Sequence, residues 1–246
     1  MLHDHLPFFV IVSAIFFAAG FVKGVLGMGL PTFAMGFLGL LMPVPQAASL
    51  LTLPSFVTNL WQSLGGGHFR ALLRRLWTFQ LAIAAGVGGA ALLPPLNDDM
   101  GRTLLGGCLL AYGALGAAGR RLPPPPARWQ GVADPVVGAA TGLVTGLTGV
   151  FVLPAVPYLQ ALQLDRVQFT QALGLSFTTS TVALAVLLSA RGDLNLSASV
   201  HSAMSLVPAL AGMWIGQKIR DELSEAGFRK CFFFGMIALG AWLFVR

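Results

Sequence analysis

Charged side chains are scarce in this chain. Of its 246 residues only 10% are Asp, Glu, Lys or Arg, whereas 56% are hydrophobic, and the mean hydropathy is +0.78. So little polar surface cannot cover a soluble domain of this size. The composition therefore excludes an ordinary soluble protein and predicts a protein embedded in a lipid bilayer.

Cysteines and the motifs of common catalytic sites are also nearly absent. The two cysteines, Cys108 and Cys231, lie alone inside apolar segments and offer neither a disulfide nor a metal framework. The run Gly65–Gly67 is not followed by the Lys-Ser/Thr of a phosphate-binding loop, and no Ser-His-Asp or Cys-His arrangement stands out. We therefore expect no enzyme, no cofactor and no bound metal.

Acidic residues number nine, and all of them are predicted to fall in loops or at the ends of apolar segments. Many transporters coupled to protons or sodium carry a carboxylate within the membrane. Because no buried carboxylate is expected here, the sequence favours an anion as the transported solute. The charge of that anion could respond to the membrane potential.

Apolar segments fill most of the chain and fall into two sets of five. They cover residues 7–22, 29–42, 46–66, 76–95 and 101–118, then 131–148, 150–164, 167–190, 198–217 and 227–245. Several approach the ~20 residues needed to cross a bilayer, whereas the first two of each set are expected to be short spans or half-helices. We predict an all-α polytopic membrane protein without a removable signal peptide.

The domain organisation follows from this division. Residues 1–118 form the first membrane repeat, 119–130 a basic, proline-rich cytoplasmic linker, and 131–246 the second membrane repeat. Because each half has an odd number of segments, the two are expected to form an inverted repeat. The linker contains Arg120, Arg121 and the run Pro123–Pro126, which cannot continue a helix.

Basic residues indicate the orientation in the membrane. If all ten segments alternate across the bilayer, most arginines and lysines lie on the side of the linker. By the positive-inside rule that side is cytoplasmic, which predicts a multi-pass protein of the cell inner membrane. The net charge of +6 is explained in this way, and no nucleic-acid partner is expected.

Two glycine-rich interruptions form the clearest internal repeat. Residues 20–29 read GFVKGVLGMG, residues 142–151 read GLVTGLTGVF, and a proline follows each copy. Glycine-broken apolar segments at corresponding places in two halves are a pointer to the binding site of a transporter. Close helix packing through small-xxx-small contacts is the alternative.

Backbone N–H groups at such breaks can bind an anion with the help of the helix dipole. Lys23 is the only charge in the first motif. It would contact substrate if it lies near mid-membrane and would snorkel to the headgroups if it lies near a helix end. The predicted substrate-binding residues are Lys23, Gly24, Gly27, Gly29, Asn59, Thr145, Gly146, Gly149, Ser180 and Thr181.

These motifs resemble those of the sulfite exporter TauE/SafE family of membrane permeases. The resemblance rests on GFVKGVLGMGLPTF with the stretch Pro45–Ser49, and on TGLVTGLTGVFVLP with Asp165-Arg166. It covers nearly the whole chain and implies transport of a small sulfur-containing anion, such as sulfite, sulfoacetate or a related organosulfonate, across a bacterial inner membrane. Lys23 stands where members of that family commonly have an uncharged polar residue.

The sequence thus predicts a secondary transporter that works by alternating access, with the anion bound where the two glycine breaks meet. An anion channel and a non-transporting membrane scaffold or assembly protein stay open as alternatives. The expected partners are the small anion and the lipid bilayer, and the coupling ion and a homo-oligomeric state are left open.

Single cysteines test the predicted orientation. In a background without native cysteines, Asn97→Cys and Asn195→Cys should react with an impermeant thiol reagent from outside, whereas Leu72→Cys and Pro125→Cys should not, because successive loops alternate across the bilayer. The measurement is labelling of intact cells against inverted membrane vesicles. A reversed pattern would refute the trace.

Overall fold

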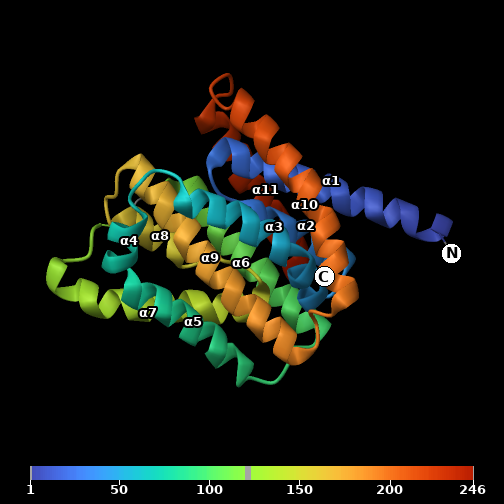
Figure 1. Ribbon diagram of the computed structural model, residues 1–246, viewed down its shortest axis with the longest axis horizontal. Coiled ribbons are helices and arrows are strands. Elements are labelled where there is room, and N and C mark those ends of the chain that lie inside the picture. Colours follow the sequence, from blue (N-terminus) through green and yellow to red (C-terminus); the bar gives the residue numbers. More distant parts are fainter. Residues whose placement is uncertain (1, 120–122, 246) are drawn as a thin grey trace.

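The computed structural model describes residues 2–119 and 123–245, and within these ranges the chain forms eleven helices and no strand. In chain order (Figure 1) they are α1 (Leu2–Leu26), α2 (Leu30–Leu41), α3 (Val44–Leu64), α4 (Phe69–Arg75), α5 (Trp77–Ala91), α6 (Asp98–Ala118), α7 (Ala127–Thr148), α8 (Ala155–Ala161), α9 (Arg166–Arg191), α10 (Leu196–Ile219) and α11 (Glu225–Val245). The predicted all-α class is confirmed. Arg120 and Arg121 of the predicted linker lie outside the described residues.

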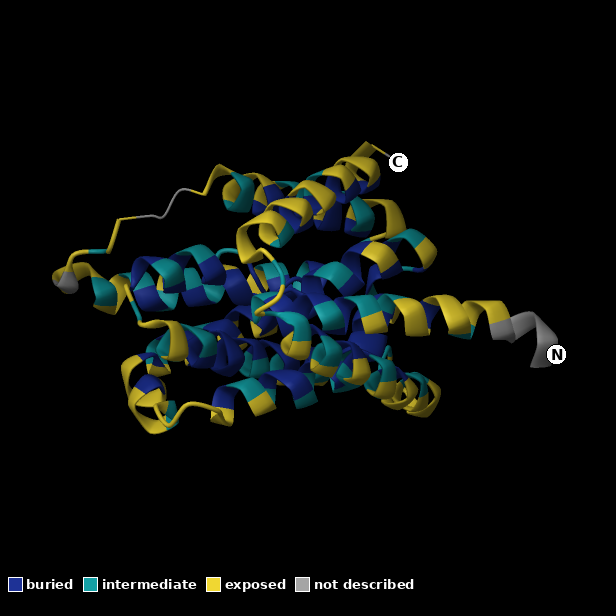
Figure 2. Ribbon diagram, turned by 90° about the horizontal axis from the view of Figure 1, so that it is seen from above, coloured by how far each residue is buried: buried dark blue, intermediate teal, exposed yellow. Residues whose placement is uncertain are grey.

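The helices have the length and surface of a membrane protein. Four of those described are long and apolar enough to cross a bilayer, namely residues Pro7–Leu26 of α1 together with α9, α10 and α11. Buried residues gather on the inward faces of the helices, and exposed residues lie on the outer surface and in the loops (Figure 2). Large apolar side chains such as Val10, Val207 and Phe234 are exposed on that surface, as expected for helices that face lipid.

Both predicted helix breaks are present. Gly27 and Gly29, between α1 and α2, have φ angles of 73° and 103°, and Gly149, after α7, has a φ of 68°. A side chain with a Cβ is strained in this left-handed region, so glycine is needed to end the helix sharply. The helices that follow, α2 with 12 residues and α8 with 7, are short, as predicted. In contrast, α1 and α7 are longer than the predicted first segments, with 25 and 22 residues.

A helix, α4, occupies the predicted loop that carries Arg70, Arg74 and Arg75. Leucine, arginine and alanine are strong helix formers, and no glycine or proline interrupts this stretch. Leu72 on α4 is only 4% exposed, so the exposed Arg74 is the better position for a labelling cysteine on this side.

Four close helix pairs build the fold. α1 packs along α10 and α5 packs along α7, while α3 packs against α9 and α6 against α11. With the short helix α4 left out of the count, α1 corresponds to α7, α3 to α9, α5 to α10 and α6 to α11. Each of the four pairs therefore joins the two halves. The pair α1–α10 corresponds to the pair α7–α5, whereas α3–α9 and α6–α11 each correspond to themselves.

Glycines make the closest of these contacts. A Cβ on Gly20 would lie 2.0 Å from the carbonyl oxygen of Ala209 in α10, and a Cβ on Gly142 would lie 2.0 Å from the carbonyl oxygen of Ile83 in α5. No side chain fits in either place, so the helix backbones themselves touch. The packing interpretation of the glycine motif therefore holds at Gly20 and Gly142.

Replacing Gly142 by alanine should force α5 and α7 apart, because the added Cβ overlaps the Ile83 carbonyl oxygen. We expect a loss of about 1–3 kcal/mol or more in the free energy of unfolding, measured as a lower Tm of the purified protein in detergent. Gly20→Ala should cause a similar loss, because its contact is the same. Gly88→Ala is the control, since a Cβ there meets nothing within 4 Å. Equal Tm values for Gly142→Ala and Gly88→Ala would contradict the packing role.

Candidate functional site

Two cavities lie beside the two glycine breaks. The Lys23 cavity has a volume of about 350 Å³ and lies between α1, α3, α9 and α10. The Arg191 cavity has a volume of about 270 Å³ and lies between α3, α7, α9 and the start of α6. Polar and glycine residues that line the first are Lys23, Gly24, Gly27, Thr58, Gln62, Gly65, Gly66, Arg166, Thr170, Gln217 and Arg220.

Lys23 lies in the last turn of α1 and is only 4% exposed. Its Nζ donates hydrogen bonds to Thr58 Oγ1, at 3.2 Å, and to Asn59 Oδ1. Both acceptors are neutral. The ion pair between Arg166 and Glu225 lies elsewhere, at the surface. The side chain thus points inward to α3 and does not snorkel to the headgroups. A buried ammonium without a carboxylate is costly, which marks Lys23 as a functional residue.

Asn59 is fully buried beside Lys23. Its Oδ1 accepts from Lys23, whereas its Nδ2 has no hydrogen-bond partner among the described residues. An unpaired buried donor costs about 1–3 kcal/mol, so native proteins rarely keep one without a reason. Lys23 and Asn59 together place a charged and a neutral donor at this end of α1, and both can donate to an oxyanion.

Gln62 ties the first break to the second half of the chain. Its Nε2 donates to the carbonyl oxygen of Gly27 at 2.9 Å and to that of Thr170 at 2.8 Å. The Gly27 carbonyl follows the end of α1 and therefore has no partner within the helix. One amide group of α3 thus satisfies the broken backbone and connects it to α9.

The charges of the Lys23 cavity have one sign. Besides Lys23, Arg220 and Arg166 line it, Arg166 being paired at the surface with Glu225, and the lining contains no acidic residue. A recess that is lined by positive charges and surrounded by protein of low dielectric constant raises the local concentration of anions. The electrostatic character of this cavity therefore favours an anionic ligand.

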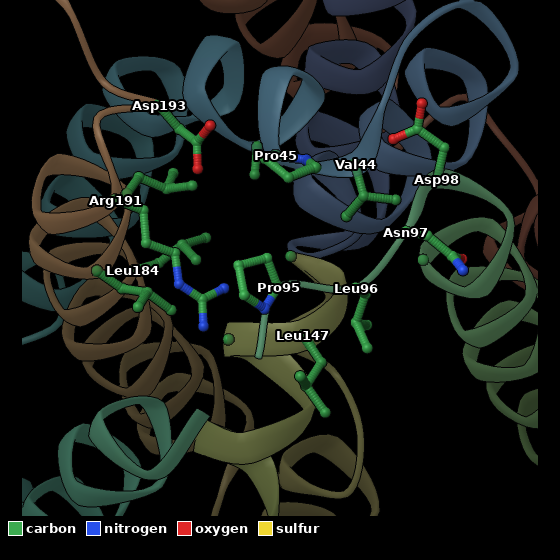
Figure 3. Close-up of a pocket in the computed structure, with 16 residues that line it drawn as sticks. Val44, Pro45, Pro95, Leu96, Asn97, Asp98, Leu147, Leu184, Arg191 and Asp193 are labelled. Atoms are coloured by element: carbon green, nitrogen blue, oxygen red, sulfur yellow. The ribbon is translucent and has the colours of Figure 1, made fainter. Parts of the chain in front are cut away.

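The Arg191 cavity has mixed charges. The Arg191 side chain reaches from α9 toward Pro95, with Asp193 nearby and Asp98 across the cavity at the start of α6 (Figure 3). Arg191 Nη2 donates to the carbonyl oxygens of Ala90, at 2.8 Å, and Leu93, at 3.2 Å. The guanidinium therefore caps the C-terminal end of α5 as well as lining the cavity.

The predicted site residues divide between the two cavities. Lys23, Gly24 and Gly27 line the Lys23 cavity, whereas Gly146 and Gly149 line the Arg191 cavity. Asn59 joins the first group through its bond to Lys23. The two breaks therefore line separate cavities, in contrast to the expected single site where they meet.

Besides Asn59, four other predicted residues line neither of these two cavities. Gly29 packs against α11. Thr145 Oγ1 donates to the Val150 carbonyl oxygen at 3.3 Å and so stabilises the second break. Ser180 is buried, and its Oγ has no partner among the described residues, while Thr181 Oγ1 bonds to its own helix. The second half therefore lacks a counterpart of the contact between Lys23 and Asn59.

One carboxylate lies well inside a helix, which corrects the prediction that no acidic residue is buried. Asp134 in α7 is 8% exposed and accepts hydrogen bonds from Tyr158 Oη and, at 3.5 Å, from Thr78 Oγ1. The prediction is wrong because α7 begins at Ala127, ahead of the predicted segment, which places Asp134 about two turns inside the helix. Asp134 lines neither cavity.

Arg191, Thr170 and Gln217 line the cavities but were not among the predicted site residues. Their only signal in the sequence is a polar side chain in or next to an apolar segment. Many residues of this chain share that feature, so it does not distinguish a cavity from a loop.

An all-helical apolar fold with a basic cavity beside a broken helix is typical of a membrane transport protein. Residues 12–243, nearly the whole chain, match the family described as sulfite exporter TauE/SafE. The chain belongs to this family of membrane permeases, which confirms the resemblance drawn from the glycine motifs. No curated protein and no solved structure matches the chain.

Gln62→Leu should destabilise the protein, because it leaves the carbonyl oxygens of Gly27 and Thr170 without their donor. We expect a loss of about 1–3 kcal/mol, measured as a lower Tm in detergent. Gln217→Leu is the control, because it removes the same type of side chain from the same cavity at a position where the side chain is exposed. If both variants melt at the wild-type temperature, the bridge through Gln62 does not stabilise the break.

Proposed function

We propose that this protein is a secondary transporter that moves a small sulfur-containing anion, such as sulfite, sulfoacetate or a related organosulfonate, across the cell inner membrane by alternating access. The observation that carries the proposal is the buried Lys23 ammonium, which is held by Thr58 and Asn59 at a cavity with basic walls. Membership of the TauE/SafE family supports the class of solute. We propose no catalytic role.

The chemistry of the Lys23 cavity fits a sulfite or sulfonate group. Such a group offers several oxygens. Lys23 Nζ, on the cavity wall, can donate to one of them, and Asn59 Nδ2 is an unpaired donor buried beside Lys23, outside the cavity lining. A hydrogen bond from an ammonium to an anion is about twice as strong as one between neutral groups. The volume of about 350 Å³ lies in the range of ligand pockets, ~300–1,000 Å³, so a small organosulfonate can enter.

Two alternatives fit the cavities less well. An open channel needs a continuous path, whereas the described residues enclose two separate cavities at the two breaks. A scaffold protein would explain the glycines that pack helices, such as Gly20 and Gly142. It would not explain a lysine buried beside neutral oxygens, since such a residue lowers stability without improving packing.

The inverted repeat and the orientation belong to the same proposal. Corresponding helices of the two halves run in opposite directions where they touch: Gly174 of α9 lies against Asn59 of α3, whereas Val167, earlier in α9, lies against Gly66, after α3. This direction supports an inverted relation of the halves. By the positive-inside rule the Lys23 cavity then faces the cytoplasm and the Arg191 cavity faces the opposite side.

Lys23→Met tests the proposed site directly. Methionine keeps the length of the side chain and removes its charge, so the apparent affinity for sulfite or sulfoacetate should fall at least about tenfold, which corresponds to ~1.4 kcal/mol. The measurements are stabilisation of the purified protein by each anion and saturable uptake into proteoliposomes. Lys218→Met is the matched control, because Lys218 lies over the Trp214 ring, 3.9 Å from its centroid, away from the cavity.

The same assays separate the alternatives. Wild-type protein that is stabilised by none of sulfite, sulfoacetate, carboxylates and phosphate would be a scaffold. Anion flux that does not saturate at modest concentration would indicate a channel. Unchanged affinity in Lys23→Met together with saturable flux in the wild type would place the anion elsewhere.

A further inference from the structure

The Lys23 cavity and the Arg191 cavity are built from corresponding residues. At the constant offset that relates Gly20 to Gly142, glycines and side chains of one cavity map onto those of the other. The pairs used below are Gly27 with Gly149, Gln62 with Leu184, and Thr170 with Ala48. In the first two pairs the residue of the Lys23 cavity belongs to the first half of the chain, and in the third pair it belongs to the second half. Each cavity therefore contains the same parts of both halves, with their roles exchanged.

The helix contacts beside the cavities repeat in the same way. A Cβ on Gly212 of α10 would lie 2.0 Å from the Phe17 carbonyl oxygen of α1. A Cβ on Gly86 of α5 would lie 2.1 Å from the Ala139 carbonyl oxygen of α7. Phe17 corresponds to Ala139 at the offset of the glycine motif, whereas Gly212 lies one turn beyond Pro208, the residue that corresponds to Gly86. The pair α1 and α10 is thus held together as the pair α5 and α7 is, and each pair can act as a rigid unit beside its own cavity.

The two cavities differ in how open they are. Thr170 and Gln62 of the Lys23 cavity are partly exposed, whereas their counterparts Ala48 and Leu184 are 2% and 3% exposed. Gly27 is partly exposed and Gly149 is buried. At these matched positions the Lys23 cavity is the open one and the Arg191 cavity is nearly closed.

We propose that the two cavities are equivalent vestibules of one pathway and that they open alternately. In this structure the Lys23 vestibule is open. In the opposite state the halves exchange their conformations. Ala48 then becomes as accessible as Thr170 is in this structure, and Thr170 becomes buried. This inference rests on the proposed transport function and specifies its mechanism, because it assigns the Arg191 cavity as the second vestibule.

The exchange is physically reasonable because the halves share their framework. Backbone contacts of similar closeness hold α1 to α10 and α5 to α7, so the two states can lie within a few kcal/mol of each other. The vestibules are not identical in chemistry. Lys23 corresponds to Thr145 and Gln62 to Leu184, so the Lys23 vestibule has the stronger attraction for an anion.

Two cysteines at corresponding positions test the alternation without any transported solute. In a background without native cysteines, the double variant Thr170→Cys and Ala48→Cys is reconstituted in vesicles. A bulky impermeant maleimide first modifies Cys at position 170 from the arginine-rich side, which wedges the Lys23 vestibule open. The rate of labelling at position 48 from the other side is then measured, and we expect it to fall about tenfold. Lys218→Cys with Ala48→Cys is the matched control, in which modification at the exposed surface should leave the second rate unchanged.

The inference is overturned if modification at position 170 leaves the rate at position 48 unchanged or raises it, if both positions react from the same side, or if position 48 never reacts in a folded variant. Pro45→Cys with Val167→Cys, another corresponding pair at the two cavities, replaces the first pair if that variant fails to fold. Transport of sulfite and sulfoacetate is measured separately on the wild type. Alternation without such transport would leave this inference standing and overturn the proposed solute, and transport without alternation would do the reverse.

Discussion

The constraint on which this structure depends is that a positive charge buried in apolar surroundings must be held by polar groups. Lys23 meets it with two neutral oxygens of α3, those of Thr58 and Asn59. Neutral oxygens orient an ammonium but do not cancel its charge, which therefore stays available to an anion. The anion site therefore depends on three features: the end of α1 carries Lys23, α3 orients it, and the cavity adds further basic residues. A carboxylate in the same place would have neutralised the lysine and removed its use as an anion site.

Broken helices within a membrane need partners for their free backbone groups, and the two halves solve this in different ways. In the first half, Gln62 reaches from α3 to the Gly27 carbonyl oxygen and connects it with α9. In the second half, the side chains of α7 do so locally: Thr145 donates to the Val150 carbonyl oxygen, and the Val150 N–H donates to Thr148 Oγ1 at 3.2 Å. The first break is thus stabilised by a side chain that connects the two halves, whereas the second is stabilised by hydrogen bonds within its own turn.

The glycine motif has two functions that the sequence presents as alternatives. Gly20 and Gly24 bring α1 against the backbone of α10, with a Cβ on Gly24 2.3 Å from the Met213 carbonyl oxygen. Gly27, one turn later, has space around it and ends the helix with a positive φ. Packing and breaking are therefore properties of successive turns of one motif. Gly20 and Gly24 fix α1 to α10, and Gly27 ends the helix beside the Lys23 cavity.

Local patterns in the sequence were enough to determine the helical class, the membrane environment, the family and the positions of both breaks. Hydropathy and glycine spacing are properties of neighbouring residues, so they can be read without the fold. The sequence could not distinguish Asn59, which accepts a hydrogen bond from Lys23, from Ser180, whose Oγ has no partner among the described residues, because both are polar residues of a third segment. It also did not reveal that the breaks line two cavities, or that Asp134 is buried with Tyr158. Those outcomes depend on which faces of distant helices meet, and only tertiary packing decides that.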